Sequence, residues 1–476
     1  MNFRVVQLLW ILSYLACCGY CRDIEQLNVL WHAPFRSGGG YCSEAYAMTR
    51  TIEAISVKKH QLDVQVHPFH HGDSINYAYL SGLKEDSRDA KIARRASMYI
   101  YPPDGSKSSN IAVCHSEPGA WDAPFPKYHT FPCPPSSGPI DYKIGRTMFE
   151  TDSIPSWLDR LSFMDEIWVP TRFHADIFER AGLPPEKVVV VGEPVDTSFY
   201  KSVDVESQRA FRAKYLGTEY EGKFLILFVG KWETRKGLKI LLKAFYEEFV
   251  THTNVTMNAS GDMNFEGDKD VVLVVLTSAY HSSDDFTQKI DNYLQGQGIL
   301  SPKQSVWDNS TLPHRIKVLT GIPQAEMPAL YSSMNVVAIP SAGEGWGRPH
   351  VEAMSCGLPV IATNWSGPTE YMTINNSLPL RVDRMVSAEG WAGHKWARPS
   401  KQHLKELLRL SYTDSSFMQD IGKAARKAMV KKYSYRKFGF VLAKELKRIE
   451  EKVNKRSQID ESTDNIDRKQ NTDAEL

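Results

Sequence analysis

The sequence predicts an α/β protein with two Rossmann-like, doubly wound domains, and three observations support this fold class. The chain has 476 residues, which is too long for one typical core and suits two domains of about 200 residues. Each half opens with a short apolar strand, a glycine-containing loop and a helix, as such domains do. A content of 42% hydrophobic and 24% charged residues is that of a globular protein.

The first half begins with a predicted strand at residues 28–32, a loop that ends in Gly39 and Gly40, and a helix near residues 43–55. The glycines do not form the G-x-G-x-x-G pattern, so no dinucleotide is implied. Further strands are predicted at residues 63–67, 97–101, 111–114, 143–149 and 188–191. His115 follows one of these strands, where a side chain points into the ligand cleft of an α/β sheet. A hydrogen-bonded structural histidine is the alternative.

The second half opens with a buried strand at residues 224–229 and a basic loop, Gly230 to Gly237, that carries Lys231 and Lys236. A helix follows to about residue 249. Further buried strands are predicted at residues 271–277, 316–319 and 335–340. Taken alone, the basic loop is compatible with a solvated turn as well as with an anion site.

The most informative stretch is residues 340–371, where a strand leads into a loop with Gly343, Gly345 and Gly347. Pro349 suits the first turn of a helix and Gly357 suits the position after its end, so we expect a helix at residues 350–356. The free N–H groups of such a helix form an anion site.

Two carboxylates frame this helix start. Glu344 precedes the helix and Glu352 lies within it. A carboxylate can accept two hydrogen bonds side by side, which matches a pair of neighbouring sugar hydroxyls. A phosphate on the helix end with a carboxylate on either side describes a nucleotide-sugar site. A charged loop of an ordinary α/β protein is the alternative from spacing alone.

Glu344 and Glu352, with the run EAMSCGLPVIAT and the later Gly367 and Glu370, resemble the E-x7-E motif of the retaining GT-B glycosyltransferases of group 1, or family 4. The resemblance extends over residues 28–451 and is strongest at residues 230–237 and 341–370. It implies two Rossmann-like domains that face a cleft and a C-terminal helix that crosses back to the first domain. We therefore expect an acceptor-side domain at residues 23–200, a donor domain at 201–434, the crossing helix at 435–452 and a disordered polar tail at 453–476.

The resemblance also implies roles for single residues. Glu352 would bind the ribose, Glu344 the donor sugar, and the amides of Gly345, Trp346 and Gly347 the sugar and diphosphate.

Lys231 and Lys236 would neutralise the leaving diphosphate, although the family commonly has Arg at the first position, and Lys lacks the bidentate fork of Arg. The loop with Gly39 and Gly40 would reach donor or acceptor, and His115 would face the anomeric centre.

The expected activity is transfer of a sugar from a nucleotide-sugar, UDP- or GDP-linked, to a hydroxyl acceptor on a glycan, glycoprotein or lipid. The resemblance implies retention of configuration, and neither a metal motif nor a cofactor is expected. The alternatives are a catalytically inactive protein of the same fold that binds sugars or glycoproteins, and a phosphorylase. A net charge of +1 does not suggest a nucleic-acid partner.

Several features predict the secretory pathway, with the endoplasmic reticulum or Golgi lumen as the destination. Residues 1–22 have the layout of a signal peptide or signal anchor, and we expect no clear membrane span if the segment is cleaved. Glycosylation sequons agree with this route, and the best acceptors are Asn254 and Asn258. The C-terminal sequence DAEL resembles a degenerate retrieval signal, or is a chance acidic tail.

The cysteines and paired histidines leave two questions open. Cys114 and Cys133 flank a proline-rich loop, where a disulfide and two free thiols are both compatible with the sequence. His70 and His71 lack further ligands at metal-site spacing, so we predict no metal there.

Overall fold

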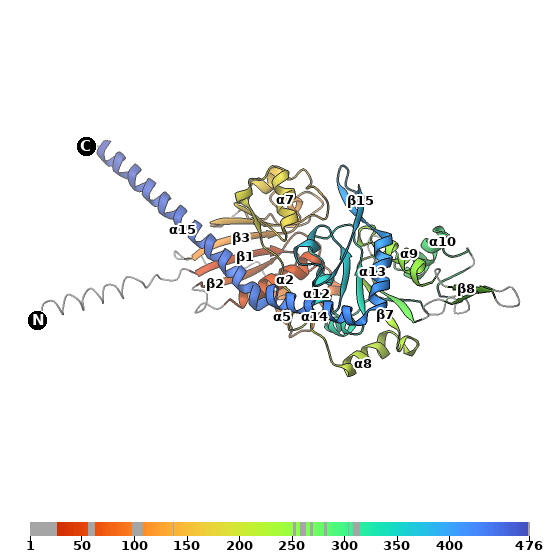
Figure 1. Ribbon diagram of the computed structural model, residues 1–476. Coiled ribbons are helices and arrows are strands. Elements are labelled where there is room, and N and C mark those ends of the chain that lie inside the picture. The colour runs from red at the N-terminus through yellow and green to blue at the C-terminus, as the bar shows by residue number, and fades with distance from the viewer. Residues whose placement is uncertain are drawn as a thin grey trace, which may run out of the picture. The chain divides into compact units, whose positions relative to one another are not determined.

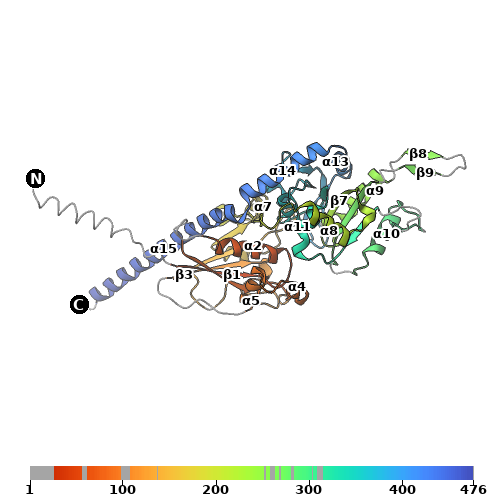
Figure 2. The ribbon, with the colours of Figure 1, turned by 90° about the horizontal axis from the view of Figure 1, so that it is seen from below.

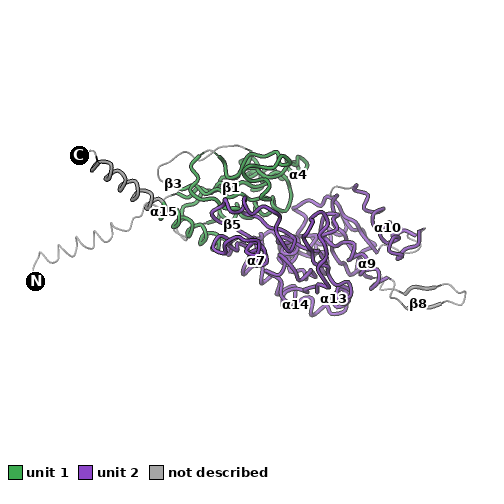
Figure 3. Tube along the Cα trace, turned by 90° about the horizontal axis from the view of Figure 1, so that it is seen from above, with its two compact units in different colours: residues 1–145, 439–476 green, residues 146–438 purple. Residues whose placement is uncertain are grey.

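The computed structural model describes residues 26–55, 62–97, 108–136, 138–250, 254–257, 263–266, 270–279, 283–302, 304–307 and 315–474. The predicted signal segment, most of the strand expected at 97–101 and the sequon at Asn258 lie outside these residues. The chain divides into two compact units, unit 1 with residues 1–145 and 439–476, and unit 2 with residues 146–438 (Figure 3). The domain boundaries predicted above stay predictions.

The first elements of unit 1 are drawn at the red end of the colour scale in Figure 1. Its strands are β1 (Gln26–Ala33), β2 (Val64–His70), β3 (Ser108–His115) and β4 (Tyr142–Arg146), the last ending at the unit boundary. Its helices are α2 (Gly40–Glu53), α4 (Tyr77–Ser81), α5 (Arg88–Arg95) and the 3-10 turn Pro118–Ala120. The long helix α15 (Tyr435–Ala474) belongs to unit 1 from Gly439 onward.

Unit 2 begins with α6 (Leu158–Ser162), β5 (Glu166–Val169), α7 (Arg172–Arg180) and β6 (Val188–Val190). It continues with α8 (Val205–Tyr215), β7 (Phe224–Val229), α9 (Leu238–Phe249), β8 (Asn254–Met257), β9 (Met263–Glu266), β10 (Val271–Leu276), α10 (Phe286–Gly296), β11 (Ile316–Leu319), α11 (Met327–Ser332) and β12 (Val336–Ile339). The last elements are α12 (Arg348–Ser355), β13 (Val360–Thr363), β14 (Leu378–Leu380), β15 (Val382–Ser387), β16 (Lys395–Pro399), α13 (Lys401–Thr413) and α14 (Ser415–Lys432). Short 3-10 turns lie at Pro185–Lys187, Thr218–Tyr220, Thr234–Lys236, Gln324–Glu326 and Gly367–Glu370.

Two six-stranded sheets form the framework, in the orders β2-β1-β3-β4-β5-β6 and β11-β10-β7-β12-β13-β14. Strands within these two sheets pair in parallel, for example β1 with β3 and β7 with β10. Helix α8 packs against α11, α9 against α13 and α12 against α14 around the second sheet (Figure 2). The predicted pair of Rossmann-like sheets is confirmed.

The central strands form because their side chains are apolar on both faces. The runs FLILFV of β7 and VVLVVL of β10 are buried for most of their length, as in a parallel sheet covered by helices on both sides. The core of unit 2 therefore runs along β7, β10 and β12, and it fixes where the loops after these strands emerge.

The structure differs from our expectation at the C-terminal tail. We predicted disorder from residue 453, but α15 continues to Ala474. The chain contains neither Gly nor Pro after Gly439, the two residues that most disfavour a helix interior. No helix in the described part of the chain is long and apolar enough to cross a membrane.

Two further differences concern unit 2. Helix α12 begins at Arg348 rather than at the predicted residue 350, because Pro349 occupies its first turn. The antiparallel hairpin of β15 and β16 was not predicted, since its polar and aromatic residues do not alternate clearly.

Candidate functional site

The two loops that the sequence singled out in unit 2 emerge side by side. In the second sheet the strand order reverses between β7 and β12, which pair with each other. Ligands of open α/β sheets bind at the carboxyl ends of the strands at such a point. The loop after β7 holds Lys231 and Lys236, the loop after β12 holds Glu344, and the Ala342 N–H donates to the Arg235 carbonyl at 2.7 Å. The topology therefore places the predicted basic loop and the predicted carboxylate in one site.

Both helices that follow these loops start without a side-chain cap. Elsewhere in unit 2, helices α7, α8, α10, α13 and α14 begin with side chains that accept a backbone N–H, from Thr171, Asp204, Asp285, Ser400 and Asp414. Helices α9 and α12 begin instead at Gly237 and Gly347, which have left-handed backbone conformations. Their N-terminal N–H groups can therefore face an anionic ligand.

Glu344 is the centre of the charged network. It is buried, and its two carboxylate oxygens accept hydrogen bonds from Lys236 Nζ at 2.9 and 2.7 Å. Burial alone would raise the pKa of Glu344, but the cations Lys236 and Arg235 outweigh it and lower the pKa to about 2. Glu344 is therefore ionised at neutral pH.

Arg235 belongs to this network, and sequence reasoning missed it. Its guanidinium donates to the Gly343 carbonyl at 2.8 Å and to Glu233 at 3.0 Å, and it lies 3.6 Å from Glu344. Burial disfavours the charged guanidinium, but Glu150, Glu344 and Glu233 together raise the pKa of Arg235 above its ordinary value. Its place between two glycines in the basic loop was the only signal for it in the sequence.

The glycines of the second loop serve different needs. A Cβ on Gly343 would lie 2.1 Å from the Glu150 carbonyl oxygen, and one on Gly345 would lie 2.1 Å from the Met148 sulfur. The packing of Met148 and Glu150 therefore requires these two glycines, and the predicted donor contact of the Gly345 amide stays a prediction. Gly347 has a φ of +96°, which a side chain would strain.

The backbone of this loop is available to a ligand, but the Trp346 side chain is not. Among the hydrogen bonds of the described residues, none starts from the N–H groups of Gly345, Trp346 or Gly347. The Trp346 indole is buried against the rings of Tyr371 and Tyr433, with centroid distances of 5.0 and 5.4 Å. The part of Trp346 that agrees with the predicted donor contact is therefore its amide.

Glu352 has a different environment from Glu344. It accepts a hydrogen bond from the Tyr331 hydroxyl at 3.0 Å, and the Arg348 Nε lies 4.0 Å away. Burial raises the pKa of Glu352, although Arg348 and the hydroxyls of Tyr331 and Tyr200 oppose that effect. The carboxylate thus accepts hydrogen bonds from phenol hydroxyls. A ribose diol supplies donors of the same kind.

Lys231 and His350, the other basic residues of these loops, do not form the ion pair with Glu344. Lys231 is exposed, and the lysine that binds Glu344 is Lys236. His350, in the first turn of α12, is fully buried, and burial lowers its pKa to about 4 despite the nearby Glu344. His350 is therefore neutral at physiological pH.

His115 lies at the end of β3 in unit 1 and is fully buried. Its Nδ1 accepts from Trp31 Nε1 at 3.0 Å, so the proton of the neutral ring is on Nε2, which lies 3.0 Å from Glu44. The Tyr41 ring lies edge-on to it, with a centroid distance of 5.4 Å. Both ring nitrogens thus face partners within unit 1, as in the structural alternative, and the catalytic role of His115 stays a prediction.

Gly39 and Gly40 form the uncapped start of helix α2 in unit 1. A Cβ on Gly40 would meet no atom within 4 Å, so the space in front of this helix start is open. Their predicted contact with a donor or acceptor also stays a prediction.

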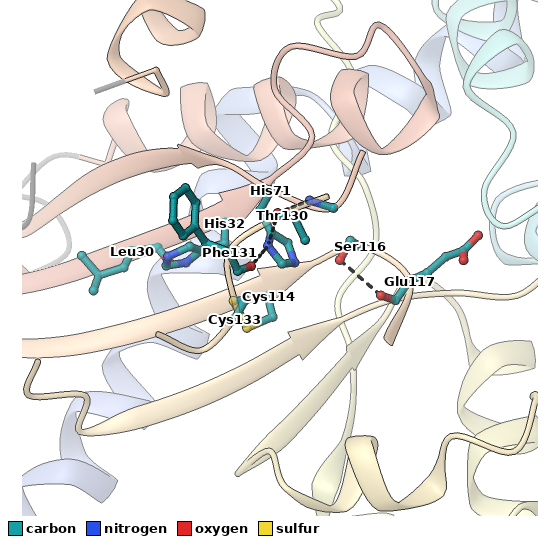
Figure 4. Close-up of a disulfide and its surroundings, with 10 residues drawn as sticks. Leu30, His32, His71, Cys114, Ser116, Glu117, Thr130, Phe131 and Cys133 are labelled. Atoms are coloured by element: carbon teal, nitrogen blue, oxygen red, sulfur yellow. Dashed lines mark hydrogen bonds between the residues drawn. A yellow bond between two sulfur atoms is a disulfide. The ribbon is translucent and has the colours of Figure 1, made fainter. Parts of the chain in front are cut away.

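The question of Cys114 and Cys133 is settled in favour of a disulfide. Figure 4 shows the disulfide next to His32 and His71. The His71 Nδ1 lies 3.1 Å from the Phe131 carbonyl oxygen and 3.2 Å from the Thr130 hydroxyl oxygen. Within the described residues, no group of three or more His, Cys, Asp and Glu side chains could hold a metal ion.

Comparison with known proteins agrees with this geometry. Residues 212–428 match the family model of glycosyl transferases group 1. The D-inositol 3-phosphate glycosyltransferase of Segniliparus rotundus is 26% identical over 217 residues, which cover 44% of this chain and 38% of that protein. The O-antigen chain mannosyltransferase B of Escherichia coli is 43% identical over 49 residues, 10% of this chain and 13% of that protein. The chain thus spans much less than two thirds of these relatives.

Solved structures share the fold over most of the chain. The crystal structure of Anabaena Alr3699/HepE in complex with UDP and glucose has a TM-score of 0.56 at 15% identity, and covers 88% of this chain and 99% of that one. Sucrose-phosphate synthase from Thermosynechococcus elongatus has a TM-score of 0.55 at 13% identity, with 89% and 99% covered. The chain therefore has the two-domain GT-B fold.

Proposed function

Because residues 212–428 match the family model of glycosyl transferases group 1, we propose that this protein transfers a sugar from a nucleotide-sugar donor to a hydroxyl group of an acceptor. The observation that carries the proposal is the Lys236–Glu344 pair at the uncapped starts of α9 and α12. A nucleotide-sugar needs cations and free amides for its diphosphate and a carboxylate for its sugar hydroxyls. All three kinds of group occur together here.

In the proposed reaction, the bond between the anomeric carbon and the β-phosphate oxygen breaks, and its electron pair leaves with the nucleoside diphosphate. The acceptor oxygen bonds to the anomeric carbon and passes its proton to the departing β-phosphate oxygen. Lys236, Lys231 and the amides around Gly347 would stabilise the charge on the leaving phosphate. Because these groups belong to the protein, the proposed reaction needs neither a metal nor a cofactor, and we propose that it retains the anomeric configuration.

Glu344 and Glu352 have separate tasks in this proposal. Glu344, ionised and held by Lys236, would accept hydrogen bonds from the donor sugar. Glu352 would bind the ribose hydroxyls in place of the phenol hydroxyls around it. We propose a UDP- or GDP-sugar as donor, with UDP-glucose tested first because UDP and glucose are bound in the Anabaena structure.

The experiment is a thermal-shift and hydrolysis screen with UDP-, GDP- and ADP-sugars. One donor should raise the melting temperature in a concentration-dependent way. At one hundred times its Kd, it should raise the free energy of unfolding by about 2.7 kcal/mol. Glu352→Ala should abolish this shift. Glu406→Ala, which removes an exposed glutamate of α13, is the matched control and should leave the shift unchanged.

Slow hydrolysis of the stabilising donor would identify the transferred sugar. Stabilisation without hydrolysis or transfer would favour the inactive sugar-binding protein instead. If the folded protein responds to none of the donors, the site assignment is wrong.

We also propose that the protein works in the lumen of the secretory pathway, in the endoplasmic reticulum or Golgi. The Cys114–Cys133 disulfide supports an oxidising compartment, since cytosolic thiols stay reduced. The signal peptide, the glycosylation of Asn254 and Asn258 and retention by the DAEL tail are parts of this proposal. A glycosidase-sensitive mass shift of the expressed protein would support it, and full accessibility to cytosolic labelling reagents would contradict it.

A further inference from the structure

The loop after β3 occupies the position in unit 1 that the candidate donor loops occupy in unit 2. In the first sheet, the strand order reverses between β1 and β3, and β1 pairs with both β2 and β3. Ligands of open α/β sheets bind where such a reversal occurs. The charged network described above uses the reversal point of the second sheet only. The first sheet therefore has a second candidate binding position, at the loop of residues 116–136.

This loop is tied down at several points. The Cys114–Cys133 disulfide closes it at its base, and the Asp122 N–H donates to the Cys133 carbonyl at 3.0 Å. His71 Nδ1 lies 3.1 Å from the Phe131 carbonyl, and the Gly72 N–H donates to Thr130 at 3.1 Å (Figure 4). The loop is thus joined to the segment that follows β2. A loop ordered in advance loses less conformational entropy when it binds a ligand.

The loop nevertheless leaves aromatic rings in water. Phe131 is 65% exposed and Phe125 is 37% exposed, while Trp121 in the same loop is buried. The rings of Phe125 and Tyr128 both pack against Gly119, so they share one part of the loop. We call residues 116–136 with Phe125, Tyr128 and Phe131 the aromatic loop. Exposed rings on a fixed loop are typical of a recognition surface.

Polar groups lie beside these rings. The Tyr128 hydroxyl donates to Glu117, and Lys127 lies 3.9 Å from Glu117 and 4.6 Å from the centre of the Tyr128 ring. The loop thus combines aromatic faces with a carboxylate, a hydroxyl and an ammonium group. One lysine beside two acidic residues, Glu117 and Asp122, is a poor match for a polyanion or an anionic membrane. It does match a sugar, whose C–H face packs on a ring and whose hydroxyls bind carboxylate and ammonium groups.

We propose that the aromatic loop binds a glycan, and that this glycan is the acceptor of the transferred sugar. The proposal rests on the proposed function, because it names the class of substrate for that reaction. Phe131 and Phe125 stack on sugar rings of the glycan, and Glu117 accepts hydrogen bonds from its hydroxyls. The disulfide holds these groups in position.

The test measures oligosaccharide binding to the full-length protein by saturation-transfer NMR, with mannotriose, chitotriose, cellotriose and maltotriose as probes. At least one probe should bind, with the saturated protons on one face of its sugar rings. Phe131→Ala and Phe125→Ala should each weaken binding by about tenfold. Phe417→Ala, which removes a ring of similar exposure from helix α14 of unit 2, should have no effect.

A second readout separates this proposal from the proposed function. Donor stabilisation and hydrolysis should be unchanged in Phe131→Ala, while transfer to the bound oligosaccharide should show a higher KM. If donor binding fails in the wild type, the proposed function is wrong. If donor binding is intact but no oligosaccharide binds, or the phenylalanine variants bind as well as the wild type, the glycan proposal is overturned. Binding of an unglycosylated peptide alone would overturn it in favour of a protein partner.

Discussion

Helices α2 and α9 hold equivalent places in the two sheets, since each follows a central strand next to the reversal of strand order, yet their surroundings differ. At the start of α9, Gly237 and its neighbours contact the loop after β12 through ion pairs and close backbone packing. At the start of α2, Gly40 has open space around it, and the nearby loop after β3 is fixed by a disulfide. Topology thus determines where a site forms, and loop composition determines which chemical groups it offers.

The largest expected effect concerns the charges of unit 2. Lys236→Met should lower kcat/KM for the identified donor by about two to three orders of magnitude, because it removes a cation from the leaving phosphate and from Glu344. Lys239→Met, which removes an exposed lysine from helix α9, should change the rate little. Steady-state kinetics on both variants give the comparison. Equal losses in the two would show that Lys236 has no special role.

The glycines test the contrast between the two helix starts directly. Gly237 has a φ of +78°, and a Cβ on it would lie 1.9 Å from the Pro340 carbonyl oxygen. Gly237→Ala should therefore lower the free energy of unfolding by about 2–4 kcal/mol. Gly40→Ala should be neutral or stabilising by about 1 kcal/mol, since it meets open space at a helix position. Urea unfolding of both variants measures the difference, and similar losses would remove the contrast.

Acid should weaken the two units through different groups, because unit 2 contains a buried carboxylate in addition to a buried histidine. In unit 1, burial lowers the pKa of His32 to about 4 and that of His71 to about 3, from an ordinary 6.5. Both histidines are neutral in the fold, so unfolding takes up protons and stability falls as the pH drops below 6.5. In unit 2, Glu344 contributes stability above about pH 4.5, and this is lost as the pH falls toward 2.

The contributions of His32 and Glu344 each amount to about 3 kcal/mol, and that of His71 to about 5 kcal/mol. Hydrogen exchange followed by mass spectrometry at a series of pH values reads the units separately. His32→Phe should reduce the dependence in unit 1 between about pH 6.5 and 4, with the contribution of His71 remaining, and Glu344→Gln should flatten that of unit 2 below about pH 4.5. His350 adds a contribution between about pH 6.5 and 4 in unit 2, which remains in the Glu344→Gln variant. Unchanged profiles in both variants would contradict this assignment.

The smallest expected effect is at Lys231. Because this side chain is exposed, water and salt screen its charge, and Lys231→Met should lower kcat/KM by about tenfold or less. Added salt should reduce the wild-type rate toward that of the variant. A loss as large as that of Lys236→Met would mean that Lys231 contacts the diphosphate directly when the donor is bound.

The fold could be predicted from the sequence because buried parallel strands are long apolar runs, as in β7 and β10. The resemblance predicted that Glu344 and Lys236 lie in one site, but it did not predict the ion pair between them. Arg235 could not be found this way, since its role depends on contacts with Gly343 and Glu150, which lie far away in the sequence. The same applies to Gly343 and Gly345, whose missing side chains accommodate residues 148–150.

The contacts of single side chains were harder to predict, because burial brings them against residues that are distant in the sequence. His115 was predicted to face the anomeric centre, which stays a prediction, but its contacts were not predicted: Nδ1 accepts from Trp31, and Nε2 lies 3.0 Å from Glu44. The donor contact predicted for the Trp346 amide stays a prediction, whereas the packing of its ring on Tyr371 was not predicted. The tail beyond residue 453 looked disordered from its polarity, although the lack of Gly and Pro permits a helix. A linear pattern shows which residues are polar, and only the tertiary structure shows what each one meets.

Unit 1 is discontinuous in the sequence, because it needs helix α15 after the whole of unit 2 has been made. Leu442, Leu446 and Ile449 of that helix are fully buried, and Lys452 Nζ lies 5.9 Å from the centre of the Tyr142 ring. During synthesis, residues 1–145 must wait for roughly half a minute before residue 439 leaves the ribosome. Unit 2 can complete its core first, so the part of the chain that is translated first finishes folding last. Nascent unit 1 therefore lacks the apolar face of α15 for that interval.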